Sequence, residues 1–155
     1  MQPMKLYLDS IGCRLNSSEI ESLARDLLAA GHEIVADVAQ ADQVVLNTCA
    51  VTREAARDTG RRVRQFHRSN AMAEIIVTGC HATLSPDKIG KLPGVRAVVS
   101  NAEKAQIAQR IDPRTINLPL FEREPIVRDF VTAGHGHTRA FVKVQDGCNN
   151  RCTFC

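Results

Sequence analysis

Three cysteines stand within eight residues in the segment Gly147–Cys155 (GCNNRCTFC), with the spacing C-x3-C-x2-C. Thiolates are soft ligands that suit iron–sulfur clusters, zinc or copper(I). A loop with this spacing can bind three corners of a cubane cluster and leave the fourth iron open for another ligand. Zinc motifs usually pair C-x2-C with further ligands that this segment lacks. We therefore expect Cys148, Cys152 and Cys155 to hold an iron–sulfur cluster, with a zinc knuckle as the alternative.

Three further cysteines, Cys13, Cys49 and Cys80, are 36 and 31 residues apart, about one strand–helix unit each. Each follows a segment that predicts a strand. Because the carboxyl ends of parallel strands lie at one edge of a sheet, these thiols are expected to meet there and to share a metal centre. The alternative is that they are small apolar core residues. A zinc site that includes His81 or His32 is a third interpretation, although neither histidine stands at zinc-finger spacing.

The elements that would position these cysteines alternate along the chain. Apolar runs predict strands at residues 5–9, 43–47, 74–78 and 95–99. Helical spacing predicts helices from a capping box at Ser18 and Glu21 to Gly31, and over residues 53–68, 87–91 and 102–110. Strands that alternate with helices indicate right-handed crossovers. We expect a flavodoxin-like α/β fold, with a mostly parallel sheet and helices on both faces.

The chain is long enough for one ordinary core, since it has 155 residues and 44% apolar content. We expect an α/β domain over residues 1–111 and a linker over 112–138, where prolines and glycines interrupt any period. Residues 139–155 would then form the first strand and cluster loop of a truncated second domain. No apolar run suits a membrane helix or a signal peptide, so a cytoplasmic monomer is expected.

The net charge of +3 is too small to indicate a partner by itself. One helix is more informative, because five of its arginines fall within about 80° of one another on a helical projection. They are Arg53, Arg57, Arg61, Arg64 and Arg68. This ridge would suit RNA phosphates, and an ordinary solvated helix face is the alternative. Asn16 and Asn47 stand close to cysteines and could donate hydrogen bonds to cluster sulfurs or serve as turn and cap residues.

Four motifs in order resemble those of the radical S-adenosylmethionine (SAM) methylthiotransferases. GCNNRCTFC is similar to the radical SAM signature, and the upstream segments are similar to the three cysteine segments of the family's amino-terminal domain. These segments are GCRLNSSE (12–19), NTCAVT (47–52) and VTGC (77–80). Within the family, VKVQDGCNNRCTFC most resembles MtaB-type members, which act on N6-threonylcarbamoyladenosine 37 of tRNA.

The resemblance implies an enzyme with two [4Fe-4S] clusters. Cys148, Cys152 and Cys155 would bind the radical SAM cluster, and Phe154 would lie against the adenine of SAM. Cys13, Cys49 and Cys80 would bind an auxiliary cluster that carries the sulfur to be inserted. One SAM would methylate that sulfur, and a second would yield the radical that abstracts hydrogen from C2 of the adenine. The implied partners are tRNA and an electron donor of the flavodoxin or ferredoxin type.

Other functions remain open at this level. Neighbouring family types act on isopentenyladenosine in tRNA or on ribosomal protein S12. A non-catalytic α/β module that binds metal or RNA, with zinc in its cysteine tail, is the alternative from a different class. Because most of the radical SAM barrel and the RNA-binding TRAM domain are missing from these 155 residues, we expect the chain to be inactive by itself.

Overall fold

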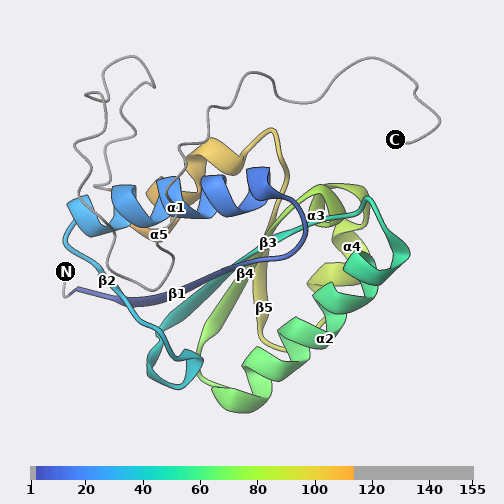
Figure 1. The fold of residues 1–155 in the computed structure, drawn as a ribbon. Coiled ribbons are helices and arrows are strands. Elements are labelled where there is room, and N and C mark those ends of the chain that lie inside the picture. Colours follow the sequence, from blue (N-terminus) through green and yellow to red (C-terminus); the bar gives the residue numbers. More distant parts are fainter. Residues whose placement is uncertain (1–2, 114–155) are drawn as a thin grey trace. The chain divides into compact units, whose positions relative to one another are not determined.

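A computed structural model describes residues 3–113. Its centre is a sheet of five parallel strands in the order β2-β1-β3-β4-β5 (Figure 1). The strands are β1 (Lys5–Ser10), β2 (Glu33–Ile34), β3 (Gln43–Thr48), β4 (Glu74–Gly79) and β5 (Val95–Val99). This order is the flavodoxin-like one, in which the chain reverses its direction of winding between β1 and β3. The predicted α/β class is therefore confirmed for this part of the chain.

Helices cover both faces of the sheet. In chain order they are α1 (Arg14–Ala29), α2 (Arg53–Ser69), α3 (Cys80–Leu84), α4 (Pro86–Gly90) and α5 (Ile107–Ile111), with short 3-10 turns η1 (Val38–Gln40) and η2 (Lys104–Gln106). Figure 1 shows α1 and α5 on one side of the sheet and α2, α3 and α4 on the other. One apolar cluster joins the sheet to α1 and α5, and a second joins it to α2, α3 and α4. Burial of these two faces is the main stabilisation of the fold.

The central strands are buried because they are almost uninterrupted runs of apolar residues. In β3 the side chains of Val44, Val45 and Leu46 are fully buried, and in β4 those of Ile75 and Val77 are too. Parallel strands that carry helices on both faces require this pattern. The register sets Ser10 beside Asn47 and Thr48 beside Gly79. Strands β1, β3 and β4 therefore end close together, at what we call the carboxyl edge of the sheet; their first residues form the amino edge.

The first helix is the largest departure from the sequence prediction. Helix α1 begins at Arg14, with Cys13 as its N-cap, so the predicted capping box of Ser18 and Glu21 lies inside the helix. Cys13 provides no side-chain cap, and helix formation here follows the contact with the sheet rather than a capping signal. The predicted end is confirmed, since Gly31 adopts φ +88° directly after the helix. Leu27 is fully buried against the sheet, whereas Leu28 is 42% exposed.

Smaller elements also differ from prediction. Strand β2, two residues long, carries too short a pattern to be read from sequence. Helix α3 follows β4 at a place where the sequence predicted no helix, and the predicted helix at 102–110 divides into η2 and α5. Helix α2 is confirmed, with Thr52 accepting a hydrogen bond from the amide of Ala55 as its N-cap. None of the helices within residues 3–113 has both the length and the apolar character that a membrane crossing requires.

Candidate functional site

Three cysteine segments lie at the carboxyl edge. Cys13 follows β1 by three residues, and Cys49 and Cys80 directly follow β3 and β4. The predicted common edge is therefore confirmed by the topology. Because β1 and β3 flank the point where the winding reverses, Cys13 and Cys49 stand on the two sides of the crevice in which doubly wound sheets bind ligands.

Gly12 brings the first cysteine segment onto the second. It adopts φ +109°, and a Cβ built on it would lie 2.3 Å from Cβ and 2.8 Å from Sγ of Cys49. Any other residue would be strained by its backbone conformation and would also collide with the cysteine side chain. A glycine is thus required at this position for the backbone beside Cys13 to approach Cys49 so closely.

Gly79 has the same role for the third segment. Its φ of +99° and ψ of −170° belong to a region that is nearly exclusive to glycine. An added Cβ would lie 2.2 Å from the carbonyl oxygen of Thr48 and 2.5 Å from Oδ1 of Asn47. The chain can therefore turn from β4 into Cys80 only by passing directly against the end of β3.

The thiols differ in their access to solvent. Cys13 is exposed, Cys80 is intermediate and Cys49 is 5% exposed within the apolar cluster beneath α2, and all three are free. Among residues 3–113, no group of three or more His, Cys, Asp or Glu side chains is placed close enough to hold a metal ion. The three segments meet, but the thiols as placed do not form a ligand set.

The donor chemistry and the glycine cradle nevertheless fit a shared soft-metal group. Free thiols at three adjacent strand ends supply soft ligands, and Gly12 and Gly79 remove the side chains that would fill the space between the segments. The amide oxygen Oδ1 of Asn47 is also buried without a hydrogen-bond partner at this edge. A buried acceptor of this kind is rare unless something else satisfies it.

The two asparagines beside the cysteines use their amide donors inside the protein. Nδ2 of Asn16 donates to the carbonyl oxygen of Ile11 at 2.8 Å, and Nδ2 of Asn47 donates to Glu19 at 3.0 Å and to the carbonyl oxygen of Asn16 at 3.2 Å. These bonds support the interpretation that the two side chains fix turns, and Oδ1 of Asn16 also accepts from the thiol of Cys13 at 3.7 Å; hydrogen bonds to cluster sulfurs stay a prediction. Both are almost completely buried.

His81 directly follows Cys80, and its charge state is set by its surroundings. Burial lowers the pKa of His81 from its ordinary value, and the positive charge of Lys88 lowers that pKa further. The imidazole is consequently neutral at neutral pH. The zinc alternative that includes His32 is not supported within the described residues, because His32 is buried with its Nε2 3.2 Å from Oδ2 of Asp112.

The loop after β5 also reaches the carboxyl edge, and the sequence analysis missed it. Nδ2 of Asn101 lies 3.8 Å from Sγ of Cys80, and its backbone amide donates to Oγ1 of Thr83 at 2.9 Å. Lys104 forms an ion pair with Glu19. No cysteine marks this loop, so the only available signal was its position after a fourth parallel strand.

An exposed apolar residue follows each cysteine within four residues of the sequence. Leu15, Val51 and Leu84 are 39%, 59% and 73% exposed. They stand two to four residues beyond Cys13, Cys49 and Cys80, respectively. Single exposed apolar residues are ordinary, but here they share the edge that carries the thiols. The sequence analysis did not single them out, since exposure cannot be read from residue type.

The second cysteine set and its neighbour lie outside the described residues. This applies to the metal-ligand predictions for Cys148, Cys152 and Cys155, to the SAM contact predicted for Phe154, and to the linker and second-domain boundaries. All of them stay predictions.

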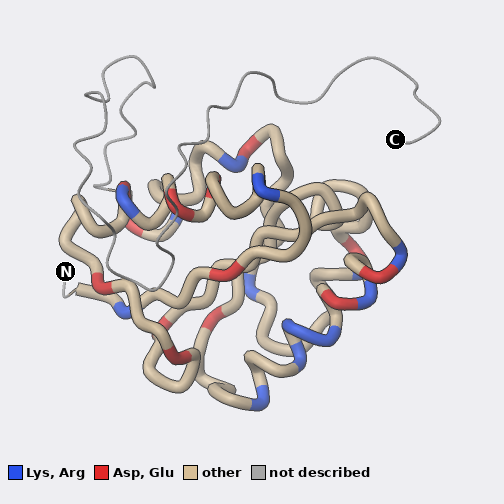
Figure 2. Tube along the Cα trace, in the orientation of Figure 1, with Lys and Arg blue, Asp and Glu red and all other residues tan. Residues whose placement is uncertain are grey.

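The basic ridge is present on α2 as expected. Its five arginines are all exposed, and Figure 2 shows basic residues recurring along the length of the helix. The buried side consists of Ala55, Thr59, Val63 and Phe66. Arg61 pairs with Asp58 on the same helix at 2.8 Å, which reduces the charge that this arginine can offer to a partner. Whether RNA binds here stays untested.

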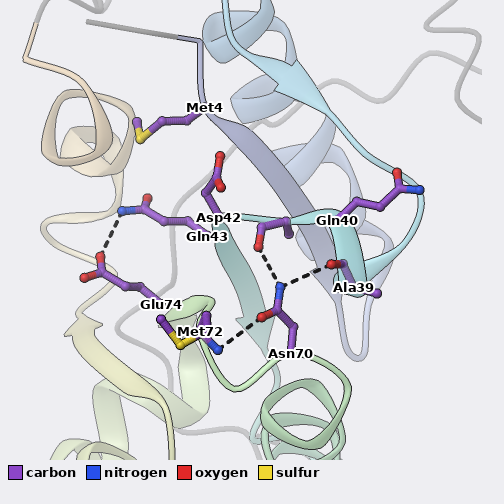
Figure 3. A pocket seen from close by; sticks show the side chains of 9 residues that line it. Met4, Ala39, Gln40, Asp42, Gln43, Asn70, Met72 and Glu74 are labelled. Atoms are coloured by element: carbon purple, nitrogen blue, oxygen red, sulfur yellow. Dashed lines mark hydrogen bonds between the residues drawn. The ribbon is translucent and has the colours of Figure 1, made fainter.

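A shallow depression of about 480 Å³ lies at the amino edge (Figure 3). Its lining includes Asp42, Gln43, Asn70 and Glu74, and Nε2 of Gln43 donates to Glu74 at 3.1 Å. These residues precede or begin β3 and β4. The depression is therefore at the opposite end of the strands from the cysteines, and it does not belong to the thiol site.

Comparison with known proteins shows which family this chain resembles. Residues 5–100 match the uncharacterized protein family UPF0004. A threonylcarbamoyladenosine tRNA methylthiotransferase MtaB from Aquifex aeolicus (strain VF5) is 34% identical over 160 residues, which cover 98% of this chain and 39% of that protein. A tRNA-2-methylthio-N(6)-dimethylallyladenosine synthase from Syntrophobacter fumaroxidans (strain DSM 10017 / MPOB) is 31% identical over 164 residues, with 99% and 36% covered.

The chain thus spans between a third and two fifths of the length of these curated relatives. Among solved structures, a pilus assembly-related protein from Burkholderia pseudomallei K96243 gives a TM-score of 0.47 at 11% identity, with 75% of this chain and 92% of that chain covered. That likeness is too weak to carry an argument.

Proposed function

Because the chain belongs to the UPF0004 family and is related to the tRNA methylthiotransferases, we propose that it is the α/β part of an enzyme that adds a methylthio group to C2 of N6-threonylcarbamoyladenosine 37 in tRNA. The choice of this nucleoside is supported by the MtaB relatives of Aquifex aeolicus and Thermotoga maritima, both 34% identical. The segment VKVQDGCNNRCTFC around Cys148, which most resembles MtaB-type members, also favours this nucleoside.

The observation that carries the proposal is the approach of the backbone beside Cys13 to Cys49. Gly12 has no side chain where a Cβ would lie 2.8 Å from Sγ of Cys49. A core cysteine does not require such a conformation, whereas a group shared between two strand ends requires the segments to be this close. We propose that Cys13, Cys49 and Cys80 hold a [4Fe-4S] cluster.

Two such clusters and SAM would supply the radical and sulfur chemistry that a strong aromatic C2–H bond requires. The residues of this chain have simpler tasks. The three thiolates would bind the cluster, and the glycines would keep the segments in contact. The exposed apolar side chains at the carboxyl edge would help to exclude water once the site is covered.

The rest of the proposal concerns residues outside the described part. Cys148, Cys152 and Cys155 would bind the radical SAM cluster, with Phe154 against the adenine of SAM. The α/β domain would end near residue 111, which agrees with the end of α5 at Ile111, and a second domain would begin near residue 139. The enzyme would work in the cytoplasm, with tRNA as substrate and a flavodoxin or ferredoxin as electron donor.

A second substrate is supported by one observation. The relative from Syntrophobacter fumaroxidans is named for dimethylallyladenosine and is 31% identical to this chain, only slightly below the MtaB relatives. Identity of this order does not separate the two nucleosides. Mass spectrometry of tRNA nucleosides from a strain that lacks the gene would decide: loss of 2-methylthio-N6-threonylcarbamoyladenosine supports the proposal, and loss of the isopentenyl product supports the second candidate.

The cluster itself is tested by iron and sulfide analysis after anaerobic reconstitution. The chain would carry Cys148→Ala, Cys152→Ala and Cys155→Ala, so that bound iron reports only on the other three thiols. We expect about four iron and four sulfide per chain, as a [4Fe-4S] cluster contains. Further substitution of Cys13, Cys49 or Cys80 by alanine should remove them.

Met72→Ala provides the matched control for that experiment, because Met72 is 89% exposed at the amino edge and should leave the iron content unchanged. Stoichiometric zinc without sulfide would contradict the proposal and support a non-catalytic metal-binding module.

A further inference from the structure

A set of side-chain contacts joins three elements behind the cysteine segments. The carboxylate oxygen Oε2 of Glu19, on α1, accepts from Nδ2 of Asn47 at 3.0 Å and from Nζ of Lys104. Asn47 belongs to the end of β3, and Lys104 begins the turn η2 after β5. One carboxylate therefore binds donors from two segments that are distant from it in sequence.

The same contacts continue to the turn that carries the first cysteine. The backbone amide of Ile11 donates to the carbonyl oxygen of Asn47 at 2.8 Å, and the carbonyl oxygen of Ile11 accepts from Nδ2 of Asn16 at 2.8 Å. Asn16 is in turn held by Nδ2 of Asn47 through its own carbonyl group. Ile11 is thus fixed from β3 and from α1, and Gly12, which follows it, lies against Cys49.

The residues that make these contacts are largely shielded from solvent, which strengthens the hydrogen bonds between them. Asn47 is 1% exposed, and the side chains of Glu19 and Lys104 are 16% and 17% exposed. Hydrogen bonds to a charged group are stronger than neutral ones, and a low local dielectric strengthens them further. Removal of one partner would leave the remaining polar groups poorly satisfied.

The position of Lys104 is notable because its loop touches the thiol site at two points. Asn101, three residues earlier, has its Nδ2 3.8 Å from Sγ of Cys80. The loop after β5 therefore contacts the third cysteine directly and the first two through Glu19 and Asn47. The loop carries no cysteine of its own, so it would not supply a thiolate ligand.

We propose that Lys104 is a positioning residue, which through Glu19 and Asn47 holds the turn of Ile11–Cys13 closed over Cys49 before any cofactor binds. The inference rests on the proposed function in that the thiols are the ligands of the cluster. The closed turn itself is a property of the metal-free chain, and it can be measured without iron.

Alkylation of Cys49 in the metal-free, reduced 155-residue chain tests the proposal. N-ethylmaleimide would be added anaerobically, and the rate at each cysteine would be read from its peptide by mass spectrometry. In the unsubstituted chain Cys49 should react far more slowly than exposed Cys13. Lys104→Ala should accelerate Cys49 by roughly tenfold, since the loss of a sheltered charged partner has about this effect on a local opening equilibrium. Lys104→Arg, which keeps the charge, should restore most of the protection.

Two controls separate local opening from general loss of stability. Arg110→Ala removes a positive charge that pairs with Glu103 at 2.7 Å on the exposed surface of the same region, and it should leave the Cys49 rate unchanged. Asn70→Ala destabilises the chain at the amino edge and shows how far global unfolding alone accelerates Cys49.

An unchanged Cys49 rate in Lys104→Ala would overturn the proposal. So would equal acceleration by Arg110→Ala, or by Asn70→Ala at the same loss of stability. Lys104→Ala should add little to the effect of Glu19→Ala, because Glu19 is the group through which Lys104 acts on Asn47; full additivity would contradict the shared role. Failure of the chain to bind iron, with labelling as expected, would overturn the proposed function and leave the positioning role intact.

Discussion

The two edges of the sheet are made from the same strands but are built differently. At the amino edge, Asn70 accepts from the backbone amides of Met72 and Ala73 and donates to three carbonyl groups of the turn before β3. At the carboxyl edge, Gly12 and Gly79 adopt positive φ and hold one segment against the next, with Cys49 or backbone atoms of Thr48 where a Cβ would lie. Gly94 at the amino edge also has positive φ, but an added Cβ there would meet only side-chain atoms. Buried acceptors without a partner occur at both edges, as Oδ1 of Asn47 and Oε1 of Gln43.

The difference separates a structural edge from a candidate functional one. The polar side chain that closes the amino edge is fully used in bonding the fold together. The carboxyl edge instead combines free thiols with glycines that leave no room for a Cβ between neighbouring segments, and a backbone constrained in this way costs stability unless it serves another purpose. The comparison predicts that substitutions at the two edges affect different properties.

The largest effect is expected from Gly79→Ala. Its Cβ would lie 2.2 Å from the carbonyl oxygen of Thr48, which is backbone and cannot move aside, and its φ and ψ exclude alanine. Urea denaturation should show a loss of about 3–5 kcal/mol, combining strain with a steric clash. Gly31→Ala is the matched control, since Gly31 also has positive φ but nothing within 4 Å of the added Cβ; about 1 kcal/mol is expected there. Equal losses would show that the crowding at the carboxyl edge is unimportant.

Asn70→Ala should follow, with a loss of about 2–3 kcal/mol, because several backbone groups, three of them in partly buried hydrogen bonds, lose their partner at once. Iron binding by the folded variant should be unaffected, as the amino edge holds no part of the thiol site. Asn70→Asp, which retains the acceptor and loses the donor, should fall between Asn70→Ala and the unsubstituted chain. A loss of iron in folded Asn70→Ala would contradict the proposed independence of the two edges.

The arginine ridge gives a test that relates both edges to RNA. Helix α2 begins at the carboxyl edge with Arg53 and ends near the amino edge with Arg68. If tRNA approaches the thiols, Arg53→Glu with Arg57→Glu should weaken its binding by the complete enzyme more than Arg64→Glu with Arg68→Glu. We expect about tenfold for the first pair, with a lower salt slope, since each lost phosphate contact reduces it by about 0.7–0.9. Equal or absent effects, measured by filter binding over a salt series, would indicate a solvated face.

The smallest effect on stability is predicted for the exposed apolar residues. Val51→Ser should change the free energy of unfolding by no more than about 0.5 kcal/mol, as is usual for exposed positions, because Val51 is 59% exposed. If the side chain helps to exclude water in the assembled enzyme, the same change should lower the yield of methylthiolated nucleoside per turnover of SAM. Unaltered coupling would show that Val51 has no role at the site.

The sequence by itself determined the sheet and most of its helices. Alternation of apolar runs with helical spacing located β1, β3, β4 and β5 to within a residue or two, because a strand buried on both faces must be apolar throughout. The same reasoning placed Cys13, Cys49 and Cys80 at one edge, since all strands of a parallel sheet end on the same side. Residue types also indicated the soft-metal chemistry.

Only the tertiary structure decided how the edge is assembled. The start of α1 at Arg14 depends on contact with the sheet. No side-chain cap marks this start in the sequence. The roles of Gly12 and Gly79 depend on neighbours more than thirty residues away, Cys49 and Thr48. Lys104 and Asn101 meet the cysteine segments only because β5 ends beside β4. Close approach, burial and shared hydrogen bonds are properties of two segments that folding brings together. The residue pattern of one segment does not indicate which other segment it will contact.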